Sequence, residues 1–322
     1  MLKNIFAKYE HGNIFLLVVG LLAALFFSAT FLINRSISLE GGHWYWSASL
    51  RYVYTILFLG FGLFAFRGKV YFLRVWREFF AHLGFWTLAG SIGFGSFYAF
   101  LCFAADFSPA WVVATTWQIT IIASLFVLSF FGQKLPKSIW ALSFVIFIGI
   151  SCVNLSHFDV SDYKPLLLGF IPVLIAALSY PLGNQMVWMS KKKRHDEGDE
   201  SVKLLNNAFV KVFLLTLGSY PVWIALGLFV DVGVPSAGQF VSVAFVALLS
   251  GVIATSLFLY ARNKANTPSK LMLVDATQSG EVVFALLGEV IFLGAVLPNL
   301  MGLFGIVITI IGLIAIVKKG KT

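Results

Sequence analysis

Ten long apolar runs limit what this chain can fold into. A continuous apolar run of about 18 residues or more is typical of a helix that crosses a membrane, where no water satisfies an open backbone. Only 11% of the 322 residues are charged, against about 25% in soluble domains, which excludes a soluble protein. We predict an all-α integral membrane protein with ten membrane-spanning helices, at residues 13–34, 44–66, 80–104, 108–131, 137–155, 165–189, 204–230, 239–261, 270–293 and 298–317.

The loops between these spans carry very unequal numbers of basic residues. When the loops are assigned alternately to two sides, 19 of the 23 Lys and Arg residues share the side of the N-terminus. Only Arg35 and Lys164 lie on the other side, and the last two lie inside spans. Because basic loops stay in the cytoplasm, we expect both termini there, in a multi-pass protein of the plasma (inner) membrane. The formal charge of +9 then reflects topology and the lipid bilayer, not binding to nucleic acid.

The two halves of the chain resemble each other. Five short motifs recur in the same order at offsets of 153 to 163 residues, among them L-A-A-L-F-F (22–27) with I-A-A-L-S-Y (175–180). Each half holds five spans, an odd number, so the second half enters the membrane from the opposite side. We therefore expect two inverted five-helix repeats, 1–157 and 158–322, with 191–203 as a flexible cytoplasmic linker between spans six and seven. Such repeats are typical of secondary transporters, whose substrate sites lie near the membrane midplane.

Glycines and prolines inside the spans indicate close packing and possible moving parts. Gly90, Gly93 and Gly95 in span three permit neighbouring helices to approach closely. Pro181 in span six and Pro221 in span seven each remove a backbone hydrogen bond and favour a kink.

At this point the residues resemble a known group. The sequence is similar to the drug/metabolite transporter superfamily of the ten-helix type, and most closely to its multidrug resistance efflux branch. The residues that carry the resemblance are Arg51, F-Y-A-F-L-C-F-A-A-D-F-S-P-A-W (97–111), G-Q-K-L-P (132–136), Q-S-G-E-V-V-F-A-L-L-G-E (278–289), Gly305 and Gly312. The resemblance implies a ten-helix exporter of small molecules.

The chain departs from the family pattern in two places. The family typically ends the fourth helix of each repeat with Gly-Glu, which Gly288 and Glu289 fit, whereas Gln133 stands in the first half. Small multidrug transporters of the same superfamily couple drugs to protons through a glutamate in their first helix, and span one (13–34) holds no acidic residue. Their coupling residue therefore has no counterpart at that position here.

Span nine carries a polar face inside an apolar segment. At about 100° per residue, Asp275, Gln278, Glu281 and Glu289 fall within an arc of about 120°. A carboxylate that faces lipid costs several kcal/mol, so we expect this face to point into the bundle or a watery cavity. The sequence therefore makes these four residues candidates for a substrate or ion pathway.

The three carboxylates differ in depth along span nine. Asp275 lies near the inner interface, where it either pairs with Lys270 or Arg262 or belongs to the pathway. Glu289 lies near the outer end, and a structural role is favoured there. Glu281 is about 16 Å along the helix from Lys270, nearest the midplane.

Two roles remain open for Glu281. Either it pairs permanently with Arg51 or Lys211, or it binds protons or a cationic substrate.

Further candidates come from the other spans. Arg51 and Lys211 occupy matching places in the two halves, where they either form structural ion pairs or contact an anionic substrate. Aromatic faces attract lipophilic cations, although ordinary packing explains most of the 34 Phe residues. The wall residues that we favour are Tyr98, Trp117, Gln118 and Tyr180.

The sequence favours a secondary active transporter, an exporter of lipophilic or cationic drugs or small metabolites by alternating access, with a proton as possible coupling ion. No cofactor is expected, and no G-x-x-x-x-G-K-[S/T] pattern for ATP binding occurs. One alternative is a carrier of anionic metabolites or sugar conjugates that uses Arg51 and Lys211. A second is a membrane-embedded enzyme acting on lipid. The five histidines are scattered and the two cysteines lie in apolar runs, which disfavours an enzyme or metal site.

Overall fold

The protein is a helical bundle in this computed structural model. The structure describes residues 12–132, 137–156, 163–266 and 268–319, and every regular element in these ranges is a helix. Gln133, which departs from the family motif, lies outside the described residues. The first elements in chain order are α2 (Asn13–Leu39), α3 (Trp44–Ala81), α4 (Leu83–Gly90), η1 (Ser91–Ser96), α5 (Phe97–Ala104), α6 (Ala110–Trp117), α7 (Ile119–Phe130) and α8 (Lys137–Ser156).

The remaining elements show how the later spans are subdivided. They are η2 (Pro165–Phe170), α9 (Ile171–Asp196), η3 (Glu200–Asn206), α10 (Ala208–Gly218), α11 (Tyr220–Phe229), α12 (Ala237–Val246), η4 (Ala247–Ala254), α13 (Thr255–Lys264), α14 (Pro268–Ala276), η5 (Thr277–Ser279), α15 (Gly280–Leu293) and α16 (Leu300–Lys319). In several places neighbouring elements join end to end to form one membrane-spanning stretch. For example, α12, η4 and α13 together form Ala237–Lys264.

The helices have the length and composition expected of a multi-pass membrane protein. Among the described residues, nine helical stretches are long and apolar enough to cross a membrane, and they coincide with the first nine predicted spans. The tenth predicted span falls on α16, whose apolar part, Leu300–Ala315, is shorter. The multi-pass membrane protein is therefore confirmed, while the inverted repeat and the side of each terminus stay predictions.

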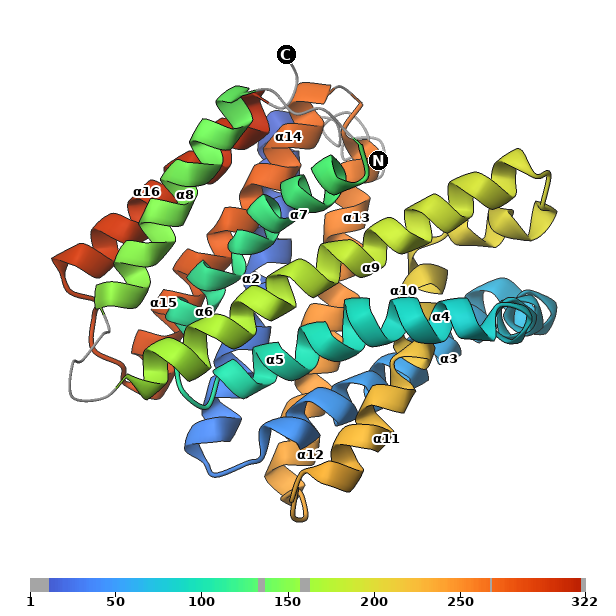
Figure 1. Cartoon of the computed structure of the whole chain (residues 1–322), viewed down its shortest axis with the longest axis horizontal. Helices are drawn as coiled ribbons and strands as arrows, with labels where there is room; N and C mark the ends of the chain where they lie inside the picture. The colour runs from blue at the N-terminus through green and yellow to red at the C-terminus, as the bar shows by residue number, and fades with distance from the viewer. Residues whose placement is uncertain (1–11, 133–136, 157–162, 267, 320–322) are drawn as a thin grey trace, which may run out of the picture.

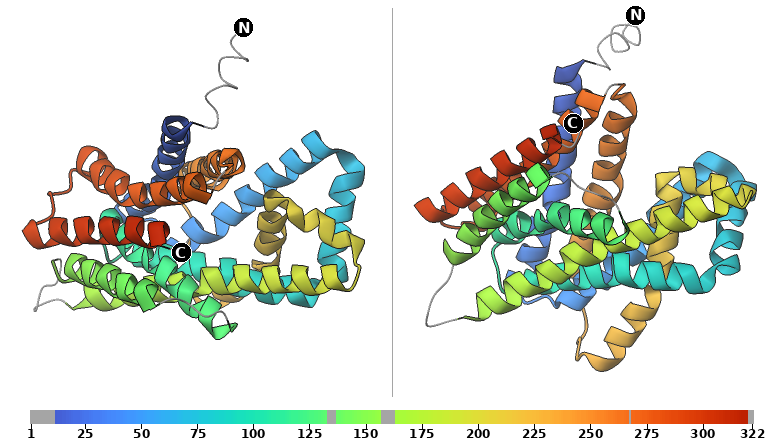
Figure 2. Two further views of the ribbon diagram at one scale, coloured as in Figure 1. Left: turned by 90° about the horizontal axis from the view of Figure 1, so that it is seen from above. Right: turned by 45° about the horizontal axis from the view of Figure 1, so that its top comes forward.

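α3 is longer than the predicted second span. Gly68 adopts φ 81° and ψ 164°, which interrupts the helix because only glycine takes this conformation without strain. A second helical piece, residues 69–81, follows at an angle to the first, as Figure 2 shows in blue. It carries Arg74, Arg77 and a buried Val75, and our span prediction missed it because its charges lower the hydropathy.

Several spans are distorted in their middle. π-helical turns form η1 in the third span and η4 in the eighth, and the fourth span breaks at Gln118 between α6 and α7. In the ninth span the 3₁₀ turn η5 separates α14 from α15. Such distortions free backbone groups and turn side chains, and they are frequent at functional sites.

Glycines bring the central helices into backbone contact, as the sequence predicted. A Cβ added to Gly93 in η1 would lie 2.9 Å from the Cα of Gly183 in α9, and one added to Gly90 would lie 2.4 Å from the carbonyl oxygen of Leu215. A Cβ on Gly95 would lie 3.0 Å from Val222. The close approach expected of these three glycines is therefore confirmed.

A second glycine contact joins two peripheral helices. α8 and α16 lie side by side in Figure 1, in green and red. A Cβ on Gly305 would lie 2.6 Å from the carbonyl oxygen of Gly149, so neither position has room for a side chain. The small residues let dispersion contacts form along both helices, which is the main attraction available between helices in lipid.

The segment 191–203 is folded, contrary to our expectation of a flexible linker. α9 continues to Asp196, and η3 follows after a turn at Gly198. Arg194, only 8% exposed, donates hydrogen bonds to both carboxylate oxygens of Glu78 at 2.7 and 2.8 Å. Because its partner lies in the second piece of α3, far away in the sequence, local charge patterning could not reveal it. Both helix ends lie at the right of Figure 1.

Further hydrogen bonds extend this Glu78–Arg194 clamp. Arg194 Nε donates to Asp199 at 2.9 Å, and Trp86 Nε1 donates to Glu78 at 3.2 Å. Hydrogen bonds from Ser201 and Arg194 hold the pKa of Asp199 at about 2, so this carboxylate stays ionised near neutral pH. The clamp fixes the end of α9 against α3 and α4.

A methyl group at Gly183 should destabilise the bundle. Gly183→Ala places a Cβ 2.3 Å from the Cα of Gly93, and overpacking of this kind costs about 1–3 kcal/mol. Gly62→Ala is the matched control, since nothing lies within 4 Å of its added Cβ, and helix propensity favours Ala by about 1 kcal/mol. Thermal unfolding in detergent should show a lower midpoint for Gly183→Ala alone. Equal midpoints for the two variants would contradict the close contact.

Removal of the Arg194 guanidinium should be more damaging than removal of an exposed charge. Arg194→Met leaves Glu78 buried without its partner, which costs about 3–5 kcal/mol. Lys203→Met instead breaks an ion pair with Glu200 whose side chains are 73% and 79% exposed, and such pairs contribute about 1 kcal/mol or less. Unfolding in detergent measures both. The double variant Glu78→Met, Arg194→Met should recover most of the loss, and no recovery would speak against a paired clamp.

Candidate functional site

The polar face of the predicted ninth span is divided among three elements. Asp275 lies on α14, Gln278 on η5, and Glu281 and Glu289 on α15. The 3₁₀ turn changes the helical register between the first two and the last two. The four side chains consequently have separate surroundings and do not form one site.

Asp275 forms an ion pair with Arg262 at the end of α13. Both side chains are about a third exposed, at 33% and 38%. This is one of the two pairings that the sequence suggested, and it joins α13 to α14.

Glu289 caps a neighbouring helix. Its carboxylate is 3% exposed and accepts a hydrogen bond of 3.1 Å from the backbone N–H of Trp111, in the first turn of α6. The N-cap residue of α6 is Pro109, whose side chain has no acceptor, so Glu289 supplies one from α15. Arg35 Nε lies 4.0 Å from the same carboxylate. The geometry gives Glu289 a structural contact between α15 and α6.

Glu281 has a different environment. Its side chain is 7% exposed, and no group among the described residues forms a hydrogen bond or ion pair with it. Nearby Gln278 has a buried Nε2 that also lacks a hydrogen-bond partner within the described part of the chain. A buried carboxylate without a partner carries a large desolvation cost in its charged form.

Arg51 lies in the core without a carboxylate. Its guanidinium donates to Thr30 Oγ1 at 3.4 Å and to Ser250 Oγ at 3.2 Å, and it stands 4.0 Å from the ring centroid of Tyr98. No acidic side chain in the described ranges forms an ion pair with it. The pairing of Arg51 with Glu281 that the sequence allowed is thus absent from this conformation.

An aromatic cluster lies beside Arg51, which stands over the ring of Tyr98. Tyr98, fully buried, packs on Phe97 at 5.7 Å between ring centroids, and Phe97 packs on Trp117 at 4.9 Å and on Tyr180 at 5.1 Å. Phe94 stacks on Tyr180 at 6.5 Å. We call Phe94, Phe97, Tyr98, Trp117 and Tyr180 the aromatic cluster.

The structure brings together most of the residues that we favoured from the sequence. Tyr98, Trp117 and Tyr180 belong to the aromatic cluster, and Gln118 lies at the helix break beside it, where Nε2 donates to the carbonyl oxygen of Ala114 at 3.3 Å. Lys211 is the exception. It lies in the first turns of α10, and within the described residues no hydrogen bond or ion pair joins it to Arg51 or Glu281.

Sequence reasoning missed Thr30 and Ser250, the two groups that accept hydrogen bonds from Arg51. Ser250 lies in the π-helical turn η4, and Thr30 Oγ1 donates to it at 2.7 Å. Asn34 Nδ2 donates to the Tyr98 hydroxyl at 3.0 Å and to Cys102 Sγ at 3.4 Å. A single hydroxyl residue in an apolar run is a weak sign of a binding site in the sequence. Only the contact between segments about 200 residues apart shows that Ser250 belongs to the site.

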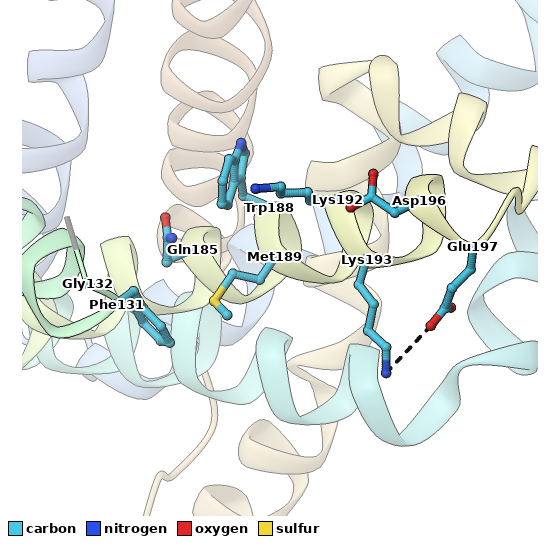
Figure 3. Close-up of a pocket in the computed structure, with 9 residues that line it drawn as sticks. All are labelled: Phe131, Gly132, Gln185, Trp188, Met189, Lys192, Lys193, Asp196 and Glu197. Atoms are coloured by element: carbon cyan, nitrogen blue, oxygen red, sulfur yellow. Dashed lines mark ion pairs between the residues drawn. The ribbon is translucent and has the colours of Figure 1, made fainter.

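A surface pocket lies away from these residues. It has a volume of about 620 Å³ and opens beside the charged end of α9, where Figure 3 shows its lining from α9 and from the end of α7. Its charges are already matched, since Lys193 pairs with Glu197 at 3.8 Å and Lys192 stands 5.5 Å from the Trp188 ring. None of the predicted site residues lines it. We therefore centre the candidate site on Glu281, Arg51 and the aromatic cluster.

Comparisons with known proteins agree with a membrane transporter. Residues 14–321 match the family model described as "Putative multidrug resistance efflux transporter". The chain is 38% identical over 314 residues, 92% of each protein, to "Uncharacterized protein YjlA" of Bacillus subtilis (strain 168). It is 35% identical over 279 residues to the "Uncharacterized 42.1 kDa protein in intracellular alkaline protease 3'region" of Shouchella clausii, which is 82% of this chain and 69% of that protein. A solved crystal structure covers 95% of this chain and 99% of its own with a TM-score of 0.56 and 14% identity, which shows the fold alone.

Substitutions at Glu289 should reveal a structural role. Glu289→Gln keeps an oxygen that accepts from Trp111 and should unfold close to the parent. Glu289→Ala leaves the first turn of α6 and the Arg35 side chain without their acceptor, which costs about 1–3 kcal/mol. Thermal unfolding in detergent distinguishes the two. If Glu289→Gln destabilises as much as Glu289→Ala, the capping contact is not what Glu289 supplies.

Proposed function

This chain belongs to the multidrug resistance efflux transporter family, and we propose that it is a secondary active exporter coupled to protons at Glu281. Its substrates are lipophilic or cationic compounds or small metabolites. The transport cycle is alternating access between two inverted five-helix repeats, with both termini in the cytoplasm. Membership of the family supports efflux, and the residues of the candidate site support the mechanism.

The unpaired carboxylate of Glu281 carries this proposal. An intramembrane carboxylate without a fixed partner is stable when it holds a proton or a bound cation, and unstable when it holds neither. Proton and substrate therefore exclude each other at one group. This competition is the physical basis of exchange. The transporter changes from one open side to the other only when the carboxylate holds either a proton or a substrate.

The pattern of helix contacts supports the inverted repeat. The first predicted span, α2, packs against η4 and α13 of the eighth and against α15 of the ninth. In the same way α9, the sixth span, packs against η1 and α5 of the third and against α7 of the fourth. The first span of each half thus packs against the third and fourth spans of the other half. A pseudo-two-fold axis in the membrane plane requires this exchange. The site then lies where the two repeats meet.

The distorted helices support movement about this site. Glu281 lies two residues after the end of η5, and Trp117 and Gln118 stand at the break between α6 and α7. A broken helix changes direction at less cost than a continuous one, since its hydrogen bonds are already interrupted. We expect these two positions to act as hinges of the fourth and ninth spans.

Flux through proteoliposomes tests the coupling. The purified parent should move a fluorescent cation such as ethidium when a pH gradient is imposed, and Glu281→Gln should lose this gradient-driven flux by at least ten-fold. The amide is neutral and of similar size, so it cannot exchange a proton. Glu289→Gln and Asp275→Asn are the matched controls, because each changes a carboxylate of the same span that has a structural partner.

The controls decide how a loss is interpreted. Both variants should keep gradient-driven flux within about two-fold of the parent. That result would show that the loss in Glu281→Gln comes from this one carboxylate and not from removal of any carboxylate in the span. Gradient-driven flux that persists unchanged in Glu281→Gln would remove Glu281 as the coupling residue.

A further inference from the structure

The second helical piece of α3, residues 69–81, presents a face of exposed basic and apolar side chains. At about 100° per residue these side chains fall within an arc of about 140°. They are Lys69, Val70, Leu73, Arg74, Arg77, Phe80 and Ala81. The one acidic residue of this piece, Glu78, is buried against Arg194 and does not belong to the face. A face of this composition matches a partner that is both apolar and negatively charged.

The opposite face of this piece packs on the bundle, so the direction of the exposed face is fixed. Val75 is fully buried, and the Trp76 ring packs on Phe213 of α10 at 5.8 Å between centroids. Arg194 holds Glu78 through two hydrogen bonds. The helix cannot rotate to bury its basic side chains without breaking these contacts.

The basic side chains of this face have no partner within the described residues. Lys69, Arg74 and Arg77 form no hydrogen bond or ion pair there. The acidic side chains at the end of α9 and in η3 are paired with their own neighbours. These pairs are Lys193–Glu197, His195–Asp196, Arg194–Asp199 and Lys203–Glu200. The three positive charges are therefore free to bind an anionic partner outside the chain.

The face continues the lipid-facing surface of the membrane-spanning piece before it. Only Gly68 separates the two pieces of α3, and Phe61 and Phe66 on the first piece are 73% and 87% exposed. In the left view of Figure 2 the second piece lies at the right-hand edge, between the first piece and α4, and runs crosswise to α9. A helix that leaves a span in this way lies along the membrane surface.

We propose that the second piece of α3 lies in the headgroup region of the cytoplasmic leaflet and binds anionic phospholipids of that leaflet. Lys69, Arg74 and Arg77 bind the phosphate groups, since a guanidinium fits a phosphate with two parallel hydrogen bonds. Leu73 and Phe80 pack against the upper part of the acyl chains. The leaflet follows from the proposed topology, whereas the transported substrate and the coupling residue play no part in the inference.

A lipid surface accounts for both components of the face, whereas a soluble anion accounts for one. Leu73 and Phe80 are each more than half exposed, and a soluble phosphate compound would leave them in water. A basic residue near an anionic leaflet strengthens binding by about five-fold. The apolar residues add contacts that do not depend on charge. We therefore expect anionic phospholipid to bind this helix more tightly than neutral phospholipid.

Hydrogen exchange tests the lipid contact on the unmodified chain. Mass spectrometry would compare the purified full chain in nanodiscs of phosphatidylcholine alone and in nanodiscs with about a third phosphatidylglycerol. Backbone amides of residues 69–81 should exchange about ten-fold more slowly in the anionic nanodiscs, because bound headgroups restrain local opening of the helix. Amides of α11, in the other half of a membrane span, should exchange equally in both.

Two double variants with the same loss of charge assign the contact. Arg74→Gln with Arg77→Gln should abolish the difference between the two nanodiscs over residues 69–81. Lys193→Gln with Lys203→Gln is the matched control, because it removes two exposed charges of the neighbouring elements that already have carboxylate partners. This control should keep the difference. Because the comparison of lipids on the parent needs no variant, a misfolded variant does not affect that test.

Three outcomes would overturn the inference. The first is equal exchange of residues 69–81 in the two nanodiscs. The second is a difference that persists in Arg74→Gln, Arg77→Gln, since the charge of the remaining chain would then be responsible. The third is equal protection by soluble glycerophosphoglycerol added to neutral nanodiscs, which would identify a free phosphate compound, and not the bilayer, as the ligand.

Discussion

Inside a lipid bilayer the backbone has to satisfy its own hydrogen bonds, and this constraint determines how the site is built. Loops are not available at that depth, so polar chemistry enters through distorted helices. In this protein the distortions coincide with the polar residues. Ser250 lies in a π-helical turn, Gln118 at a helix break, and Gln278 in a 3₁₀ turn that ends two residues before Glu281. The positions where the helices are irregular are therefore also the positions that carry the polar side chains of the site.

The second requirement of the site is close packing around it. Without a hydrophobic effect between helices in lipid, small residues and backbone contact provide the attraction. Gly93 and Gly183 meet directly beside Phe94, and Gly20 receives Thr277 of the 3₁₀ turn, whose Oγ1 would lie 2.4 Å from an added Cβ. The site is thus held in place by packing contacts between small residues that take no part in binding or proton transfer. This separates the residues that shape it from those that act in it.

Much of this architecture could be predicted from the sequence, because hydropathy and glycine position are local signals. The apolar runs matched the helical stretches, and Gly90, Gly93 and Gly95 make the expected approaches. The partners of charged groups could not be predicted, since they depend on contacts between distant segments. Arg51 meets hydroxyl groups rather than a carboxylate, and Arg194 lies buried although its neighbours in the sequence are solvated. Lys211 matched Arg51 by position in the repeat but not by surroundings.

The clamp between Glu78 and Arg194 has a consequence for biosynthesis. The two residues are 116 positions apart, and a ribosome adds about 5–20 residues per second, so Glu78 emerges on the order of ten seconds before its partner. During that interval Glu78 lacks the guanidinium that donates to both of its carboxylate oxygens. The second piece of α3 therefore cannot dock in its final place early. The contact between the second piece of α3 and the end of α9 therefore forms only after Arg194 has been synthesised.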